Sequence, residues 1–289
     1  MTKRTKVLAI TGASLAGLLL LTVVISISVI RTQWFRDYVR NKIISITEES
    51  TGGKVTIGSF DFDWTALHVV IKNFVLHGTE PASEPPLFKA QEVDLQLKLF
   101  AGLKKAVDLE YLGVQQPAVN VMVFPDGKTN IPSPRVPSKP SEKSGLETVV
   151  NLAIHKVEIV NGYAQYQQQK TAFSAKGENL RAQLFYDTVS PQYRGELNID
   201  PLLLSSAGQE PLRASIHLPI VLLKDEVDLR GARISTVNSV INLTGALQNM
   251  KSPQISGNLD AHIALSDIQQ ASHFSLDTSW KGAPSALDA

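Results

Sequence analysis

The chain contains no cysteine. This absence excludes disulfide bonds, thiolate metal ligands and cysteine nucleophiles, but it does not decide the compartment, because exported proteins can also lack cysteine. The chain also has no large excess of charge of either sign, because 28 basic and 27 acidic side chains give a formal net charge of +1. Nucleic-acid binding requires a clustered basic surface that neutralises phosphates. We therefore expect no nucleic-acid partner.

Catalytic and cofactor motifs are also missing. The sequence has no G-x-S-x-G nucleophile elbow, no phosphate-binding loop and no G-x-G-x-x-G fingerprint. Asp61 and Asp63 form a close acidic pair beside aromatic residues, but a single pair is weak support for catalysis or metal binding. The histidines are scattered, without the short spacing of a zinc site. They are His68, His77, His155, His217, His262 and His273. We expect a protein that is not an enzyme and that holds no cofactor or metal.

A long uncharged run near the N-terminus predicts a membrane anchor. Residues Val7–Ile30 carry no charged side chain. At about 1.5 Å per residue, a helix over this run reaches roughly 36 Å, enough to cross a hydrocarbon core of about 30 Å. A cleaved signal peptide is the alternative, but it has a shorter apolar stretch and a cleavage site of small residues, which Ile27–Gln33 does not offer. We assign residues 1–31 to an uncleaved transmembrane helix.

The charges that flank this run predict its orientation. Lys3, Arg4 and Lys6 precede it without an acidic residue, whereas arginines and Asp37 are mixed on the other side. Excess Lys and Arg remain on the cytoplasmic side of a membrane. We therefore expect a single-pass protein with a cytoplasmic N-terminus and the body of the chain outside.

Beyond the anchor, the hydrophobic period changes from helical to alternating. Apolar residues within Thr32–Ser50 recur every three or four positions, which predicts an amphipathic helix. Trp34 and Tyr38 in it could lie at the membrane interface or pack on a sheet. From Lys54 onward, apolar and polar residues alternate, as in strands with one dry and one wet face. The predicted dry-face residues of the first strands are Leu67, Val69, Ile71, Val93, Leu95, Leu97, Leu99, Leu109, Val119 and Val121.

A segment rich in proline, serine and lysine interrupts the strands. Residues 132–146 predict an exposed linker between a first β-rich segment, 32–131, and a second one, 147–289. Strand candidates in the second segment are Ala153–Val160, Gly162–Gln167, Leu180–Tyr186, Arg194–Asp200, Leu212–Leu223, Glu226–Arg230, Val237–Leu243 and Gln254–Leu265. The expected fold is mainly β, with few helices. Either one long curved antiparallel sheet lines a groove with its dry face, or two sheets pack as a sandwich.

The order of these features resembles the N-terminal part of the AsmA-like family, and more loosely its TamB branch. After the anchor and helix, TGGKVTIGSFDFDWTALHVVIKNFVLHG (residues 51–78) is similar to a Gly-x-Val-x-Ile-Gly strand pair of the family. The next segment, 87–132, carries the family's Asp-Gly-x-x-Asn pattern at Asp126, Gly127 and Asn130.

The resemblance continues after the linker. LAIHKVEIVNGYAQYQ (152–167) is similar to a strand–Asn-Gly–strand unit of the family, here turning at Asn161-Gly162. Residues 241–268 resemble the repeated units further along such proteins. The end of the chain, SWKGAPSALDA, reads like the beginning of another repeat, which suggests a fragment or a short member of the family.

The resemblance implies a protein of the Gram-negative inner membrane whose body lies in the periplasm and supports envelope homeostasis. Related β-groove proteins carry lipid acyl chains between membranes, so membrane lipids are the expected partners and the ten dry-face residues the expected lipid contacts. TamB-like members are also connected with the assembly of outer-membrane barrels and autotransporters. The alternative is therefore a scaffold that adds strands to an open sheet edge, with outer-membrane assembly proteins as partners.

A reporter fused after Gly145 tests the predicted orientation. An enzyme that is active only outside the cytoplasm is expected to be active there, because the basic cluster before Val7 keeps the N-terminus inside. A reporter active only in the cytoplasm, fused at the same position, is the reciprocal control. Activity of the second reporter instead of the first would overturn both the orientation and the compartment.

Overall fold

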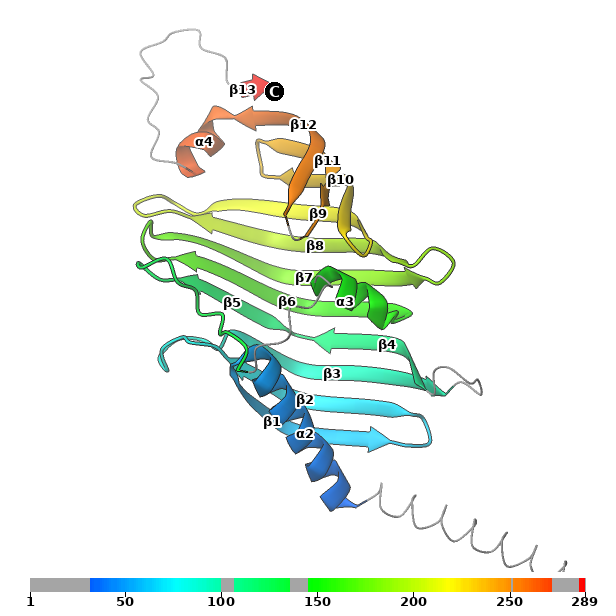
Figure 1. Ribbon diagram of the computed structural model, residues 1–289. Coiled ribbons are helices and arrows are strands. Elements are labelled where there is room, and N and C mark those ends of the chain that lie inside the picture. Colours follow the sequence, from blue (N-terminus) through cyan, green and yellow to red (C-terminus); the bar gives the residue numbers. More distant parts are fainter. Residues whose placement is uncertain (1–31, 100–106, 136–144, 251, 272–285, 289) are drawn as a thin grey trace, which may run out of the picture.

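The computed structural model describes residues 32–99, 107–135, 145–250, 252–271 and 286–288 (Figure 1). The predicted transmembrane segment, residues 1–31, lies outside this part of the chain. Among the described residues, no helix combines the length and the apolar character needed to cross a bilayer.

The described residues form helices and strands in an order that confirms a mainly β fold. The helices are α2 (Gln33–Thr51), α3 (Gly145–Leu152) and α4 (Leu265–Ala271). The strands are β1 (Lys54–Asp63), β2 (His68–His77), β3 (Phe88–Leu99), β4 (Val107–Gln115), β5 (Ala118–Val123), β6 (Lys156–Gln168), β7 (Phe173–Asp187), β8 (Gln192–Ser205), β9 (Leu212–Leu222), β10 (Glu226–Ser235), β11 (Val240–Gln248), β12 (Gln254–Ala264) and β13 (Ala286–Asp288).

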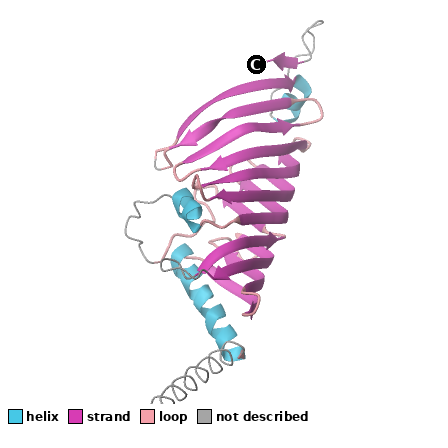
Figure 2. Cartoon of the chain, turned by 90° about the vertical axis from the view of Figure 1, so that its right-hand side faces the viewer, coloured by secondary structure: helices cyan, strands magenta, loops and turns pink. Residues whose placement is uncertain are grey.

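All of these strands join one long, curved sheet (Figures 1 and 2). Its order follows the sequence from β1 to β13, except that β5 lies beside β3 and β6. Two pairings are parallel, β6 with β4 and β6 with β5. The sheet is therefore mixed: the prediction of a long curved antiparallel sheet is wrong at these two pairings, because the chain crosses over through α3 before it enters β6. The described strands form no second sheet, so the sandwich alternative is not observed.

The Asn161-Gly162 pair does not form the predicted turn. Strand β6 runs through it, pairing with β4 before the pair and with β5 after it. Asn161 has a φ of 53°, and the register between β6 and β7 shifts here, which identifies a β-bulge. Around the bulge, the amide of Tyr163 donates to the carbonyl oxygen of Pro117 at 2.7 Å. A hairpin would lose these parallel pairings, so the bulge is favoured over the turn.

Part of the predicted linker packs against the helix α2. The amide of Arg135 donates to the carbonyl oxygen of Glu49 at 3.2 Å, and its guanidinium donates to the carbonyl oxygen of Gly53 at 3.2 Å. Residues 136–144 lie outside the described part of the chain, and α3 already begins at Gly145. The first residues of this segment are therefore fixed to the C-terminal end of α2, although Ser133, Pro134 and Arg135 are exposed.

Both α2 and α3 lie on the same side of the sheet (Figure 2). Val39, Ile43 and Ile44 of α2 pack against a buried cluster of Val55, Ile57, Phe60 and Ile71. The helix begins after Thr32, whose hydroxyl accepts the amide of Phe35 at 3.2 Å, and ends at Gly52, which adopts the left-handed conformation with a φ of 78°. A defined start, stop and packing face thus fix α2 over the first strands.

A buried asparagine locks the hairpin that follows β5. The side chain of Asn130 is fully buried; it accepts the amide of Met122 at 2.9 Å and donates to the carbonyl oxygen of Asn120 at 2.8 Å. Gly127 supplies a φ of 84° in the turn, and Asp126 accepts the amide of Lys128 at 3.0 Å. In the structure, the Asp-Gly-x-x-Asn pattern is therefore a tight turn followed by a buried asparagine that stabilises it.

Replacing Asn130 tests this lock. Asn130→Ala leaves a buried amide and a buried carbonyl without partners, so we expect the free energy of unfolding to fall by about 2 kcal/mol. Urea denaturation of the detergent-solubilised chain measures it. Asn41→Ala, at an exposed position of α2, is the control and should change stability by less than about 0.5 kcal/mol. Equal effects of the two substitutions would contradict the assigned role.

Candidate functional site: the apolar face of the sheet

The register of the strands assembles one continuous apolar surface. Residues that pair across neighbouring strands point to the same side of a sheet. One row of paired residues crosses from β1 to β12, and every member is hydrophobic or glycine. The row is Phe62, Val69, Leu95, Leu112, Val157, Leu184, Gly195, Ile220, Leu229, Gly245 and Gly257. We call the side of the sheet that carries this row the apolar face.

The next row, on the other side of the sheet, is chemically different. It consists mostly of charged and polar residues, namely Asp63, His68, Gln96, Tyr111, Lys156, Phe185, Arg194, Val221, Asp228, Ala246 and Ser256. We call this side the polar face. The alternation seen in the sequence therefore becomes a real difference between the two sides of a single sheet.

The register places almost all of the predicted dry-face residues on the apolar face. Val69 and Leu95 belong to its long row, and Ile71 pairs with Val93 beside them. Leu97 pairs with Leu109, Leu99 with Val107, and Val119 with Phe88; Val121 follows Val119 on the same side. Leu67 is the exception, because it lies in the turn between β1 and β2 with a φ of 51°. Contact of these residues with lipid stays a prediction.

Helix α2 closes the β1 end of the apolar face. Ile71 is only 7% exposed beneath it, and Val69 and Val93 pack against the same cluster. Part of the predicted lipid-contact set is therefore occupied by the protein's own helix. The sequence could not show this, because the period of a strand says nothing about which helix packs on it.

Helix α3 covers the middle of the apolar face. Val150 and Ile154 form a buried cluster with Tyr193, packed against residues of four further strands that include Leu109, Val157 and Leu184. The amide of Ile154 donates to the hydroxyl oxygen of Tyr193 at 2.8 Å, which fastens the chain just after the helix. Burial raises the pKa of this hydroxyl, so it remains protonated at physiological pH.

Other parts of the apolar face are open to solvent. Val119 on β5 and Tyr166 on β6 are 37% and 38% exposed, and Ile255 and Leu259 on β12 are 85% and 58% exposed. Gly245 and Gly257 pair next to them, and a Cβ at either position would clash with a carbonyl oxygen of the neighbouring strand, at 2.4 Å and 2.5 Å. At Gly245 and Gly257 the apolar face therefore presents backbone and no side chain. Tyr166, Ile255 and Leu259 are absent from the predicted contact set.

Charged groups on the polar face neutralise one another. The carboxylate of Glu158 accepts hydrogen bonds from Gln183 at 2.6 Å, Tyr111 at 2.9 Å and Lys156 at 3.2 Å. These donors, the Gln183 amide first, lower the pKa of Glu158, while burial and the bond to Glu158 raise the pKa of Tyr111 to about 12. Within the described ranges, no three His, Cys, Asp or Glu side chains come close enough to hold a metal ion. The charged groups of this network are therefore paired with one another.

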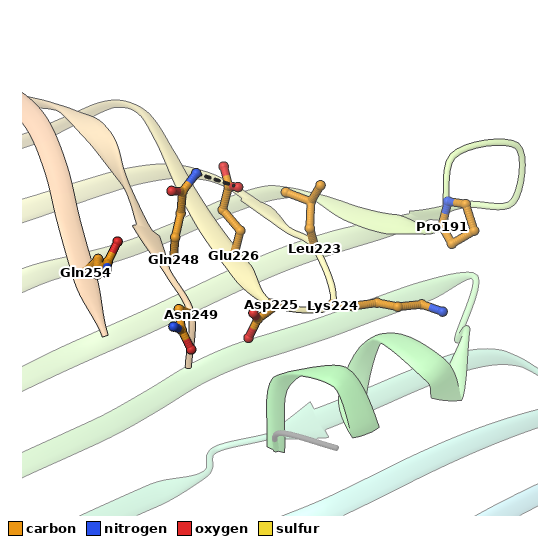
Figure 3. A pocket seen from close by; sticks show the side chains of 8 residues that line it. All are labelled: Pro191, Leu223, Lys224, Asp225, Glu226, Gln248, Asn249 and Gln254. Atoms are coloured by element: carbon orange, nitrogen blue, oxygen red, sulfur yellow. Dashed lines mark hydrogen bonds between the residues drawn. The ribbon is translucent and has the colours of Figure 1, made fainter. Parts of the chain in front are cut away.

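A depression lies at the margin of the sheet (Figure 3). It lies among the turns that join β7 to β8, β9 to β10 and β11 to β12, and includes Pro191 and Lys224. The side-chain amide of Gln248 donates to Glu226 at 2.9 Å, and the carboxylate of Asp225 accepts the amide of Met250 at 3.0 Å. Its polar groups thus bond to one another, as in ordinary turns, and we do not assign it a function.

A family model described as the AsmA family matches residues 1–276, which covers the first β-rich segment and most of the second. No curated protein matches the chain.

Two valines on α3 test whether this helix is packed as a cover. Val150 is fully buried against the apolar face, whereas Val149 next to it is 46% exposed. Val150→Ala should lower the free energy of unfolding by about 2 kcal/mol, through lost burial and a residual cavity. Val149→Ala makes the same chemical change and should cost less than about 0.5 kcal/mol. If denaturation curves showed the same loss for both, α3 would not be seated as described.

Proposed function

The chain belongs to the AsmA family, and we propose that it is an inner-membrane-anchored protein that carries lipid acyl chains on its apolar face between the inner and outer membranes. Family membership suggests a role in moving lipid or protein within the envelope. Support for the anchor comes from the uncharged run Val7–Ile30 and the basic residues before it. Such transfer would contribute to envelope homeostasis, with membrane lipids as the partners.

The observation that carries the proposal is the unbroken apolar row from β1 to β12 on a sheet of a single layer. A sheet with one dry face must bury that face against something, and large exposed apolar patches mark interaction sites. Helices α2 and α3 cover only part of it, and Ile255 and Leu259 remain exposed. An acyl chain fits such a surface because it needs no hydrogen-bond partner.

The same row also suits movement along the sheet. Each methylene group that is forced from an apolar surface into water costs about 0.8 kcal/mol. From Gly195 on β8 to Gly257 on β12 the row lies outside the clusters packed under α2 and α3 and contains only hydrophobic residues and glycine. An acyl chain on this part of the face meets no polar step that would expose it. With strands about 4.8 Å apart, the whole row extends over roughly 50 Å, so a lipid that travelled its length would have to move from strand to strand and pass α3.

A second candidate function is suggested by the edge of β12. Only His262–Ala264 pair with β13, while Gln254–Asp260 are exposed and pair with β11 alone among the described strands. An edge with unpaired backbone groups can accept an added strand from another chain. This candidate is a scaffold that holds strands of outer-membrane proteins or autotransporters during their assembly.

A photo-crosslinking amino acid at Tyr166 tests lipid carriage. We replace Tyr166 with benzoylphenylalanine, which resembles the natural aromatic side chain, and analyse the adducts formed in living cells by mass spectrometry. Tyr166 is 38% exposed on the apolar face, so a phospholipid adduct is expected. Adducts with protein alone at this position would count against lipid carriage.

Phe185 provides the matched control for this experiment. It is also aromatic and is more exposed, at 51%, but it pairs with Lys156 and Arg194 on the polar face. The same replacement at Phe185 should give no lipid adduct. Lipid captured equally at both positions would show random contact with membrane, and the proposal would fail. A protein adduct at Ile255 without lipid at Tyr166 would instead favour strand addition.

A further inference from the structure

Two aromatic side chains project from the first turns of α2. Trp34 and Tyr38 are 67% and 56% exposed, and their rings stack with centroids 5.8 Å apart at an angle of 17°. They lie one helical turn apart, on the same side of the helix. Large exposed aromatic groups are costly in water, because most of their surface is apolar. Stacked in this way, the two rings form one exposed aromatic surface.

The opposite side of α2 holds the helix rigidly to the sheet. Val39, Ile43 and Ile44 pack against the buried cluster of β1 and β2, and the guanidinium of Arg36 lies 3.9 Å from the carboxylate of Asp61 near the end of β1. The aromatic pair therefore has a fixed position relative to the sheet. It takes no part in the core, so its role must be sought outside the folded body.

The two ends of α2 differ in character. Its first turn contains no acidic residue and carries Trp34, and Tyr38 follows one turn later beside Asp37. Glu48 and Glu49 lie in its last turns, where Arg135 contacts both. In Figure 1, the N-terminal end of the helix points away from the sheet, below β1 and β2. The aromatic end of α2 is thus the end that can contact a surface outside the protein, whereas its acidic end is turned toward the sheet.

We infer that Trp34 and Tyr38 dock in the interfacial layer of a lipid bilayer and hold the β1 end of the sheet against the membrane. Tryptophan and tyrosine prefer this layer, where the ring is in an apolar environment and its polar group meets water. The uncharged run ends at Ile30, four residues before Trp34, which brings the pair to the level of the headgroups. The inference rests on the membrane anchoring that we propose above.

Docking of this pair fixes how the apolar face meets the membrane. With β1 nearest the bilayer, successive strands stack away from it, and α2 stands between the bilayer and the first strands of the face. The nearest open positions are then Val119 and Tyr166, beyond α2. The docked helix thus sets both the orientation of the sheet and the place where a lipid first reaches it.

Fluorescence quenching in lipid nanodiscs tests the docking. The chain contains three tryptophans, so Trp64→Phe and Trp280→Phe leave Trp34 as the only one in the full-length protein. The nanodiscs contain phosphatidylcholine brominated either near the carbonyl end of the acyl chain or near the bilayer centre. We expect blue-shifted emission, and quenching about twofold stronger by the shallow bromines than by the deep ones, because the ring lies at the interface.

A tryptophan at the far end of the sheet is the control. Val237 is 90% exposed in the turn between β10 and β11. Val237→Trp, combined with replacement of all three natural tryptophans by phenylalanine, should give emission typical of water and no quenching. Unquenched Trp34 in a chain that has entered the bilayer would overturn the docking alone, and a lipid adduct at Tyr166 would then still support carriage. A chain that does not enter the bilayer would overturn docking and anchoring together.

Discussion

The dry face of a single-layer sheet is the constraint on which the rest of this structure depends. Every strand from β1 to β12 contributes hydrophobic or glycine residues to one side, and water must be kept from that side if the sheet is to be stable. Most β proteins meet this need with a second sheet. Here the helices α2 and α3 supply a partial cover, and part of the remaining surface is exposed.

The partial cover divides the face into regions with different physical roles. Beneath α2 and α3, residues such as Ile71 and Val150 are packed as in any core, and their contribution is stability. At Tyr166 and Leu259 the same face is exposed, so those side chains contribute little to stability. One surface thus combines a core that keeps the strands in register with the open region on which the proposed lipid carriage depends.

The alternation of residues in the sequence predicted which side chains lie on each face of the sheet. It did not predict which helices cover the apolar face. Alternation is a local property, so Val69 and Leu95 could be assigned to the dry face without knowing their neighbours. The burial of Ile71 depends on a helix that packs over it, and the fastening of α3 depends on Tyr193, distant in sequence. At Asn161-Gly162 the local preference for a turn lost to the pairing of β6 with two earlier strands, which a local pattern cannot reveal.

The two ends of the sheet offer different opportunities for evolutionary change. At the β1 end, α2 packs on the outermost strand, so an inserted strand would have to displace a helix and its buried partners. At β12, the exposed run Gln254–Asp260 pairs with β11 alone among the described strands and could accept a further hairpin. Each such duplication would lengthen the sheet by about 10 Å. A sheet of this plan can therefore lengthen at one end while the packing under α2 stays the same.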